Sequence, residues 1–365
     1  MKYNLSDICD YVRGKVDVAS LIYENYISTE NMISNKGGIT SASSLPSVAQ
    51  TQSFQVGDIL VSNIRPYFKK IWFAEFNGGC SNDVLVLRAK DGISKKFLYY
   101  VLTDDTFFNY SMLTSKGTKM PRGDKAAIMK YEVPGFTYKE QEKIAKILEA
   151  FDKKIQLNSN INDNLEQQAQ AIFKSWFIDY EPFNGKIPST WKEYRLADFF
   201  PVVTGKKNAN VSSDSGQYPF FSCSQNIAWT DNYSFEGNAI LVAGNGDFNV
   251  KWYNGKFEAY QRTYVLIPYN PRYSSWLYYA VKYNLAKITS AARGSVIRFI
   301  TKGNLENFSF LAPRELDKYE IIDTFSTINH AIEQRVQENY RLQVFRDNLL
   351  PRLMTGEIDV SSVKI

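Results

Sequence analysis

Apolar residues alternate at spacings of four and three along residues 144–176, which places them on one stripe of a helix. The positions on this stripe are Ile144, Leu148, Phe151, Ile155, Asn158, Asn162, Leu165, Ala169, Ile172 and Trp176. This period is typical of a helix that packs along a second helix. A Thr137–Glu140 capping box predicts where the helix begins. At about 1.5 Å per residue, some 40 residues would extend roughly 60 Å.

The same stripe returns 177 residues later, which indicates an internal repeat. Residues 140–148 align without a gap on residues 317–325, and the match continues for over thirty residues. The matched pairs are Ile144 with Ile321, Leu148 with Phe325, Phe151 with Ile328, Ile155 with Ile332, Asn162 with Asn339, Leu165 with Leu342 and Ile172 with Leu349. We predict a second helix from Ile321 to Leu349, ended by Pro351 because proline breaks a helix interior. These fourteen residues are our predicted helix-packing set.

Polar residues interrupt both stripes at matching places, Asn158 and Asn162 in the first and Arg335 and Asn339 in the second. A polar residue in such a seam costs stability but commonly fixes register and partner choice. The two helices could be core helices of two ordinary domains. The gapless match favours the other interpretation, in which they pair with each other, antiparallel, as a spacer.

The segments outside the helices predict mixed strand and helix. Short β-rich runs such as 58–62, 83–87, 239–243 and 263–267 alternate with loops rich in Gly, Asn and Ser. Weaker repeats keep the same order in both halves. We therefore predict an α+β fold of two globular domains, residues 1–134 and 181–312, joined by two long helical segments, residues 135–180 and 313–365, with an internal pseudo-twofold repeat.

Composition narrows the functional class. The 365 residues include 44% hydrophobic and 22% charged residues, and the net charge is +5. The positive excess lies in residues 1–135 and 181–312, whereas both helical segments are slightly acidic. No apolar run is long enough to span a bilayer, and the N-terminus lacks the apolar core of a signal peptide. Three cysteines far apart in the sequence fit a reducing cytoplasm better than a disulfide framework.

Catalytic signatures are missing from the sequence. The single histidine, His330, excludes His-cluster metal sites and Ser-His-Asp triads. There is no Walker A motif, no GxGxxG turn and no Asp/Asn-Pro-Pro-aromatic tetrapeptide of an amino-methyltransferase. Residues 152–154 could match a loose nuclease pattern, but they fall on the heptad helix and are expected to be solvated surface. We predict no metal site and no catalytic residue.

Basic and amide side chains cluster in loops at corresponding places of both globular segments. Arg and Lys can neutralise phosphates or bond guanine, and Asn can pair with adenine. Solvated loops are the alternative for any single residue, but the recurrence in both halves favours nucleic-acid binding. The candidate residues are Asn63, Arg65, Tyr67, Lys69, Lys116, Thr118, Lys119, Arg122, Lys206, Lys207, Asn245, Asn249, Lys251, Arg293, Ser295 and Arg298.

The sequence also resembles the DNA specificity subunits of type I restriction-modification systems. The resemblance covers nearly the whole chain and is most specific in the helical segments. The motifs that carry it are Glu140-Gln-Glu-Lys-Ile-Ala-Lys-Ile-Leu, Phe151-Asp-Lys-Lys-Ile, Asn164-Leu-Glu-Gln-Gln-Ala, Phe173-Lys-Ser-Trp-Phe-Ile-Asp-Tyr-Glu-Pro-Phe and Asn348-Leu-Leu-Pro-Arg-Leu-Met-Thr-Gly-Glu-Ile. Gly117-Thr-Lys-Met-Pro-Arg and Asp58-Ile-Leu-Val-Ser-Asn-Ile-Arg-Pro also match. The second half departs from it, since Arg293-Gly-Ser-Val-Ile-Arg lacks the proline of its counterpart.

The resemblance implies a non-enzymatic subunit that binds double-stranded DNA. Each globular segment would be a target recognition domain reading half of a bipartite site, and the helices would set the gap and dock methyltransferase subunits. S-adenosylmethionine, ATP and Mg would then reside only on those partners and on motor-nuclease subunits, with no cofactor in this chain. Localisation would be cytoplasmic, without a membrane partner. A protein-interaction scaffold paired through a coiled coil is the alternative, and a cryptic metal-dependent nuclease is a third.

Overall fold

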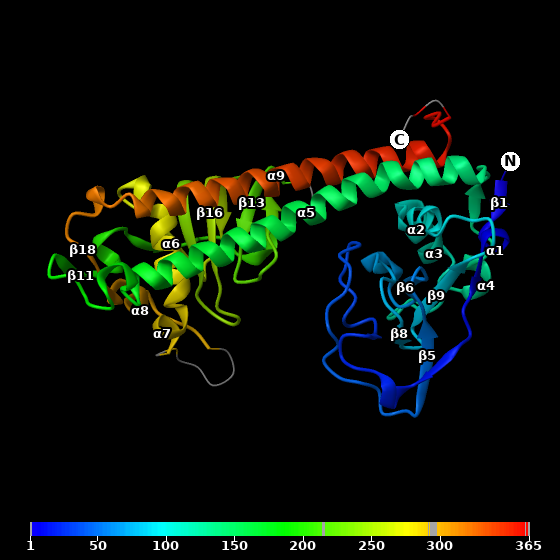
Figure 1. Ribbon diagram of the computed structural model, residues 1–365, viewed down its shortest axis with the longest axis horizontal. Coiled ribbons are helices and arrows are strands. Elements are labelled where there is room, and N and C mark those ends of the chain that lie inside the picture. Colours follow the sequence, from blue (N-terminus) through cyan, green and yellow to red (C-terminus); the bar gives the residue numbers. More distant parts are fainter. Residues whose placement is uncertain (1, 214–215, 291, 293–297, 362, 364–365) are drawn as a thin grey trace. The chain divides into compact units, whose positions relative to one another are not determined.

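The computed structural model describes every residue except 1, 214–215, 291, 293–297, 362 and 364–365. It forms two compact units, which we call the first unit (Met1–Leu157 with Glu338–Ile365) and the second unit (Asn158–Gln337). Two long helices, α5 (Tyr138–Phe177) and α9 (Ile321–Met354), each contribute to both units (Figure 1). The units are therefore not consecutive halves of the sequence, because each takes part of both helices.

The first unit combines two four-stranded sheets with short helices. One sheet has the order β2-β9-β6-β7 and the other β3-β5-β8-β4. Their strands are β2 (Cys9–Tyr11), β9 (Val84–Ala89), β6 (Ile59–Ser62), β7 (Ile71–Phe73), β3 (Lys15–Asp17), β5 (Gln50–Phe54), β8 (Gly78–Cys80) and β4 (Tyr26–Ile27). A separate pair joins β1 (Lys2–Asn4) to β10 (Glu132–Pro134). The helices are α1 (Leu5–Ile8), α2 (Lys95–Thr103), α3 (Asp105–Leu113) and α4 (Lys125–Ile128).

The main core of the first unit depends on the ends of both long helices. Ile144 and Leu148 of α5 and Leu350 and Leu353 of α9 are buried among side chains of α2, α3 and β9. The C-terminal tail closes the same core with Val360, which is buried. Burying these aliphatic side chains stabilises the unit by roughly 1.5–3 kcal/mol each, so α5 and α9 are structural parts of this domain.

The second unit is built on a six-stranded sheet of order β12-β17-β15-β16-β13-β14. Its strands are β12 (Val202–Thr204), β17 (Thr263–Leu266), β15 (Phe235–Ala243), β16 (Val250–Ala259), β13 (Tyr218–Phe221) and β14 (Ala228–Thr230). A separate pair joins β11 (Trp191–Arg195) to β18 (Ser309–Pro313). The helices are α6 (Ser274–Tyr283), α7 (Leu285–Thr289) and α8 (Lys302–Glu306).

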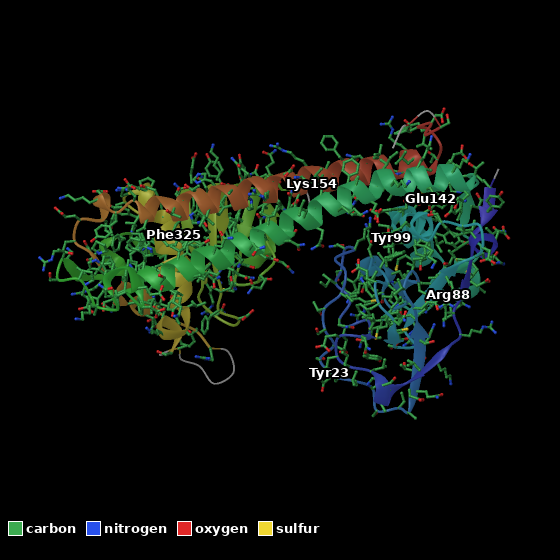
Figure 2. The ribbon with its side chains drawn as sticks, viewed as in Figure 1. Tyr23, Arg88, Tyr99, Glu142, Lys154 and Phe325 are labelled. Carbon is green, nitrogen blue, oxygen red and sulfur yellow. The ribbon has the colours of Figure 1, made fainter. Side chains whose placement is uncertain are left out.

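An aromatic cluster joins α6 to both long helices in the second unit. Phe325 of α9, labelled in Figure 2, packs on Phe173 of α5 with ring centroids 6.2 Å apart and on Tyr279 of α6 at 5.3 Å. All three rings are buried. The apolar stripes predicted from the sequence thus face the same core.

The long helices begin as predicted, but α9 continues past Pro351. At the start of α5, the Glu140 carboxylate accepts from the Thr137 N–H at 2.7 Å, and Gln141 N–H donates to the Thr137 carbonyl at 2.9 Å. The prediction that Pro351 ends α9 was wrong, since the helix runs to Met354. Leu353 and Met354 are buried in the first unit's core, and this burial offsets the hydrogen bond that proline cannot donate.

Equivalent asparagines link the two helices at positions related by the repeat. In the second unit, Asn162 Nδ2 donates to the Ile332 carbonyl at 3.4 Å. In the first unit, Asn339 Nδ2 donates to the Ile155 carbonyl at 3.3 Å. Since 162 and 155 lie 177 residues before 339 and 332, one contact is made twice. Within each unit the helices pair antiparallel, which confirms the predicted fold class.

The fourteen residues of the predicted helix-packing set all have restricted solvent access. Four are buried, namely Ile144, Leu148, Phe325 and Ile328. The other ten are half-buried. The seam polar residue Asn158 is also buried, at 1% exposure. The mid-seam residues Phe151 and Leu342 are half-buried and belong to neither core cluster of the long helices, so the centre of the seam is less fully buried than its ends.

In each unit, a buried tyrosine hydrogen-bonds to a polar side chain of a long helix. The Tyr100 hydroxyl donates to Asp152 Oδ2 at 2.6 Å, and Arg346 Nη1 donates to Asp152 Oδ1 at 2.6 Å. The corresponding Tyr279 hydroxyl donates to Asn329 Oδ1 at 3.0 Å in the second unit. Burial raises the pKa of both phenols above their usual range, so each hydroxyl keeps the proton it donates.

We expect Leu165→Asp to lower the free energy of unfolding by about 2–4 kcal/mol, because it places a carboxylate against the second unit's core. Leu157→Asp is the matched control, since Leu157 is 54% exposed on the same helix. It should cost less than about 1 kcal/mol. Denaturant unfolding followed by circular dichroism measures both changes, and equal losses would contradict the assigned seam.

Candidate nucleic-acid interface

Two basic loops of the first unit lie side by side, although about fifty residues separate them in sequence. Arg65 N–H donates to the Pro121 carbonyl at 2.8 Å, and Ile64 forms a β-bridge with Arg122. Gly123 N–H donates to the Asn63 carbonyl at 3.1 Å. Residues 63–70 and 115–122, which we call the first loop pair, therefore form one surface.

Ion pairs with nearby carboxylates hold the cations of the first loop pair. Arg122 Nη2 lies 3.2 Å from Asp83 Oδ1, and Lys116 Nζ lies 2.6 Å from Asp124 Oδ2. The Lys116 and Arg122 side chains are more than half exposed. Exposed pairs of this kind contribute only about 0–1 kcal/mol. A phosphate approaching from solvent can therefore replace the carboxylates at little cost.

A third carboxylate, Asp105 at the start of α3, collects two lysines. Lys69 Nζ lies 2.8 Å from Asp105 Oδ2, and Lys36 Nζ lies 3.0 Å from Asp105 Oδ1. Burial alone would raise the pKa of Asp105, but hydrogen bonds from both lysines lower it below its ordinary value. The carboxylate thus stays ionised and fixes the base of the 63–70 loop.

The candidate residues of the first loop pair differ in their accessibility. Asn63 is only 7% exposed, and its Oδ1 has no hydrogen-bond partner among the described residues. Its backbone instead ties the two loops together, so the side chain lies behind the surface. Arg65 is half-buried, and its Nε likewise has no partner among the described residues. Three further candidates, Tyr67, Thr118 and Lys119, are exposed.

The second unit brings together the corresponding loops. Asn245 forms a β-bridge with Phe299, and Gly246 N–H donates to the Arg298 carbonyl at 3.0 Å. The Arg298 guanidinium lies over the Phe248 ring at 5.7 Å from its centroid. Residues 244–251 and 298–300 are our second loop pair. Two further candidates, Arg293 and Ser295, lie outside the described residues.

Asn249 and Lys251 are occupied by contacts with their own loop and with residues 223–224. Asn249, 8% exposed, donates from Nδ2 to the carbonyls of Cys223 and Asp247 at 2.8 and 2.9 Å. Lys251 Nζ donates to Asn249 Oδ1 at 2.5 Å and to the Ser224 carbonyl at 2.7 Å. Burial lowers the pKa of Lys251. These two side chains set the loop's conformation.

The basic turn of Lys206 and Lys207 lies beside the second loop pair. Gln261 N–H donates to the Lys207 carbonyl at 2.9 Å, and Gly244 N–H donates to the Arg262 carbonyl at 2.8 Å. A Cβ at Gly205 would lie 2.0 Å from the Ala259 carbonyl oxygen. Only glycine permits the backbone of residue 205 to lie this close to that of Ala259. Both lysines are exposed at the edge of the sheet.

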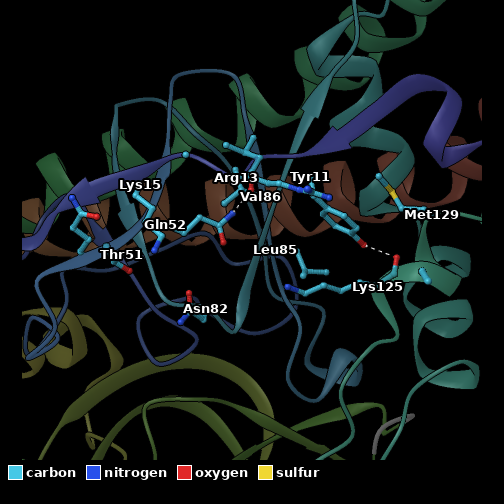
Figure 3. Close-up of a pocket in the computed structure, with 14 residues that line it drawn as sticks. Tyr11, Arg13, Lys15, Thr51, Gln52, Asn82, Leu85, Val86, Lys125 and Met129 are labelled. Atoms are coloured by element: carbon cyan, nitrogen blue, oxygen red, sulfur yellow. Dashed lines mark hydrogen bonds between the residues drawn. The ribbon is translucent and has the colours of Figure 1, made fainter.

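A groove of about 650 Å³ in the first unit carries cations that the sequence analysis missed (Figure 3). Arg13, Lys15 and Lys125 line it together with the amides of Gln52 and Asn82. Its lining residue Asn82 directly precedes Asp83, and Lys125 directly follows Asp124. Because these carboxylates pair with Arg122 and Lys116, the groove adjoins the first loop pair. Arg13 and Lys15 are near each other in sequence, but Lys125 lies far from both, so no local motif could have identified the group.

Two further findings concern membrane-spanning helices and metal-binding groups among the described residues. None of the helices in the described part of the chain is long and apolar enough to cross a membrane. Among the same residues, no three His, Cys, Asp or Glu side chains gather as a metal-binding group.

Comparison with known proteins supports one family. The family model for the type I restriction modification DNA specificity domain matches residues 1–167 and again residues 188–340. The EcoDI specificity subunit of Escherichia coli is 36% identical over 178 residues, covering 48% of this chain and 40% of the relative. The MjaIX specificity subunit of Methanocaldococcus jannaschii is 24% identical over 75% of this chain and 71% of the relative. The match to the E. coli subunit thus spans less than half of that protein.

A solved structure shows the same fold. The S subunit of a type I restriction-modification system from M. genitalium superposes with a TM-score of 0.62, at 18% identity, over 97% of this chain and 96% of that one. Together with two matches to the family model that cover most of the chain, this shows that the chain belongs to the family of type I restriction-modification DNA specificity domains.

Proposed function

We propose that this chain is the DNA-recognition subunit of a type I restriction-modification complex, in which each unit reads one half of a bipartite site. One observation carries the proposal: both units assemble a cation-bearing loop pair through an equivalent β-bridge, Ile64 with Arg122 and Asn245 with Phe299. The specificity subunits to which the chain is similar support the same role.

The chemistry of the loop pairs suits double-stranded DNA. Exposed cations such as Lys119 and Arg122 neutralise phosphates, and a guanidinium can bond both acceptors of a guanine edge in the major groove. The ordered backbone beneath them keeps these side chains in a fixed arrangement. The two loop pairs carry different residues, so the two half-sites would have different sequences.

The long helices would set the gap between half-sites and dock the partner subunits. The repeated asparagine contacts fix how the helices pair within each unit. Helix α9 also exposes Tyr340 and Phe345, at 61% and 64%. Exposed aromatic residues of this kind suit contact with a protein, here the methyltransferase subunits.

In this proposal the chain performs no reaction of its own. Methylation with S-adenosylmethionine would belong to the methyltransferase subunits. ATP- and Mg-dependent translocation and cleavage would belong to motor-nuclease subunits. The complex would act in the cytoplasm, where its DNA substrate lies.

Long-read methylation mapping tests this function directly. In cells that express the methyltransferase partner, we expect a methylated bipartite motif with a fixed unspecified gap only when this gene is present. If partner expression is confirmed and no gene-dependent motif is found, the proposal is wrong.

Arg65→Ala and Arg122→Ala test the first loop pair. Each should weaken DNA binding by the methyltransferase complex and reduce the slope of log K against log salt by about one per lost phosphate contact. Arg122→Ala also leaves Asp83 unpaired at the surface, which adds repulsion towards DNA.

Lys153→Ala is the matched control, because Lys153 is an exposed cation on α5 that lies outside both loop pairs. Its affinity and salt slope should equal those of the wild-type chain. The assignment of the loop pair fails if the two arginine variants behave as this control does.

A further inference from the structure

Strained backbone collects at one turn of the first loop pair. Six non-glycine residues of the described chain have positive φ, and four of them, Asn35, Lys36, Arg65 and Lys69, lie together. Arg65 and Lys69 bound the 3₁₀ turn Pro66–Phe68. A left-handed conformation is unfavourable for lysine and arginine and is kept only where surrounding contacts enforce it, whereas asparagine tolerates it.

Contacts on three sides enforce this turn. Asn35 N–H donates to the Phe68 carbonyl at 2.8 Å, and Lys36 N–H donates to the Lys69 carbonyl at 2.9 Å. On the other side Arg65 N–H donates to the Pro121 carbonyl at 2.8 Å. The turn also packs on α3. Its backbone is therefore held rigidly before any ligand binds.

The rigid turn presents an aromatic side chain to solvent. Tyr67 at its apex is 47% exposed, and its ring lies against the Phe68 ring with centroids 4.7 Å apart. Met120, on the neighbouring loop, is also 47% exposed. Phe68 is itself 38% exposed, so Tyr67, Phe68 and Met120 expose apolar surface together on two neighbouring loops. Exposed apolar side chains that adjoin one another commonly mark a binding site.

A second turn in the same chain shows that this geometry does not require an exposed ring. The 3₁₀ turn Glu181–Phe183 also contains proline and is bounded by positive-φ residues, Tyr180 and Asn184. Its third residue, Phe183, corresponds to Phe68 and packs on Trp191 at 5.6 Å between centroids. Its second residue is Pro182, so the turn geometry does not call for an aromatic residue at the position of Tyr67.

We infer that Tyr67 is a wedge that inserts against a base of the half-site read by the first unit, with Arg65 contacting a flanking phosphate. The inference rests on the proposed function. Side chains inserted between base steps are typically apolar or aromatic, and a preorganised ring loses little conformational freedom on stacking. In the second unit Phe248 at the corresponding place is half-buried beneath Arg298, so the wedge acts in one half-site only.

The test uses the full chain assembled with its methyltransferase subunit and DNA carrying the mapped motif. The half-site to be probed is the one whose recognition depends on Arg65 and Arg122. In it, the fluorescent base 2-aminopurine replaces each purine in turn, except the methylated adenine. With the wild-type chain and Tyr67→Phe, fluorescence should rise several-fold at one position, because the probe unstacks. With Tyr67→Ala this rise should be lost and affinity should fall roughly 5- to 100-fold. The methylated motif should stay the same, because stacking tolerates any base.

Tyr138→Ala serves as the control, since Tyr138 is an equally exposed tyrosine at the start of α5, and it should behave as wild type. The wedge is overturned if Tyr67→Ala binds DNA normally or if no position becomes more fluorescent with the wild-type chain. It is also overturned if Tyr67→Phe loses as much affinity as Tyr67→Ala, because that result would assign the effect to the hydroxyl. Each of these outcomes leaves a mapped bipartite motif intact, whereas absence of that motif refutes the proposed function itself. Equal thermal unfolding midpoints of the variants exclude misfolding.

Discussion

Burial of the two helical stripes is the constraint on which the rest of the structure depends. Neither α5 nor α9 can cover its apolar face alone. Each stripe is covered by the other helix and by a globular core, Ile144 in the first unit and Phe325 in the second. Each unit therefore needs residues from both helices, and its globular part cannot be separated from its helical support without exposing that core.

The helical scaffold was predictable because its signal is local and repeated. A period of seven residues kept over many turns, and then found again 177 residues later, leaves few alternatives. The exception was Pro351, where burial of Leu353 and Met354 outweighs the lost hydrogen bond. That outcome depends on tertiary packing, which no local rule contains.

The sequence identified candidate residues for a nucleic-acid interface, but not how the loops that carry them are arranged. Composition identified the loops, yet only the fold shows that residues 63–70 meet 115–122. Asn63 and Asn249 are of the residue type that can pair with adenine, but both are buried and hold their loops in place. The groove cations Arg13 and Lys125 come from the segment between β2 and β3 and from the start of α4, so they share no sequence motif.

The two copies of the repeat are more alike in their helices than in their loops, and this difference follows from the contacts that helices and loops make. The helix contacts are identical in kind, Asn162 with Ile332 and Asn339 with Ile155, because a change in one helix must be matched in the other. The tips of the loops are not packed against a matching segment of the repeat, so Tyr67 can be exposed where Phe248 lies beneath Arg298. Under the proposed function, a fixed frame with variable loop tips would permit the two half-sites to change independently while the pairing of the helices stays constant.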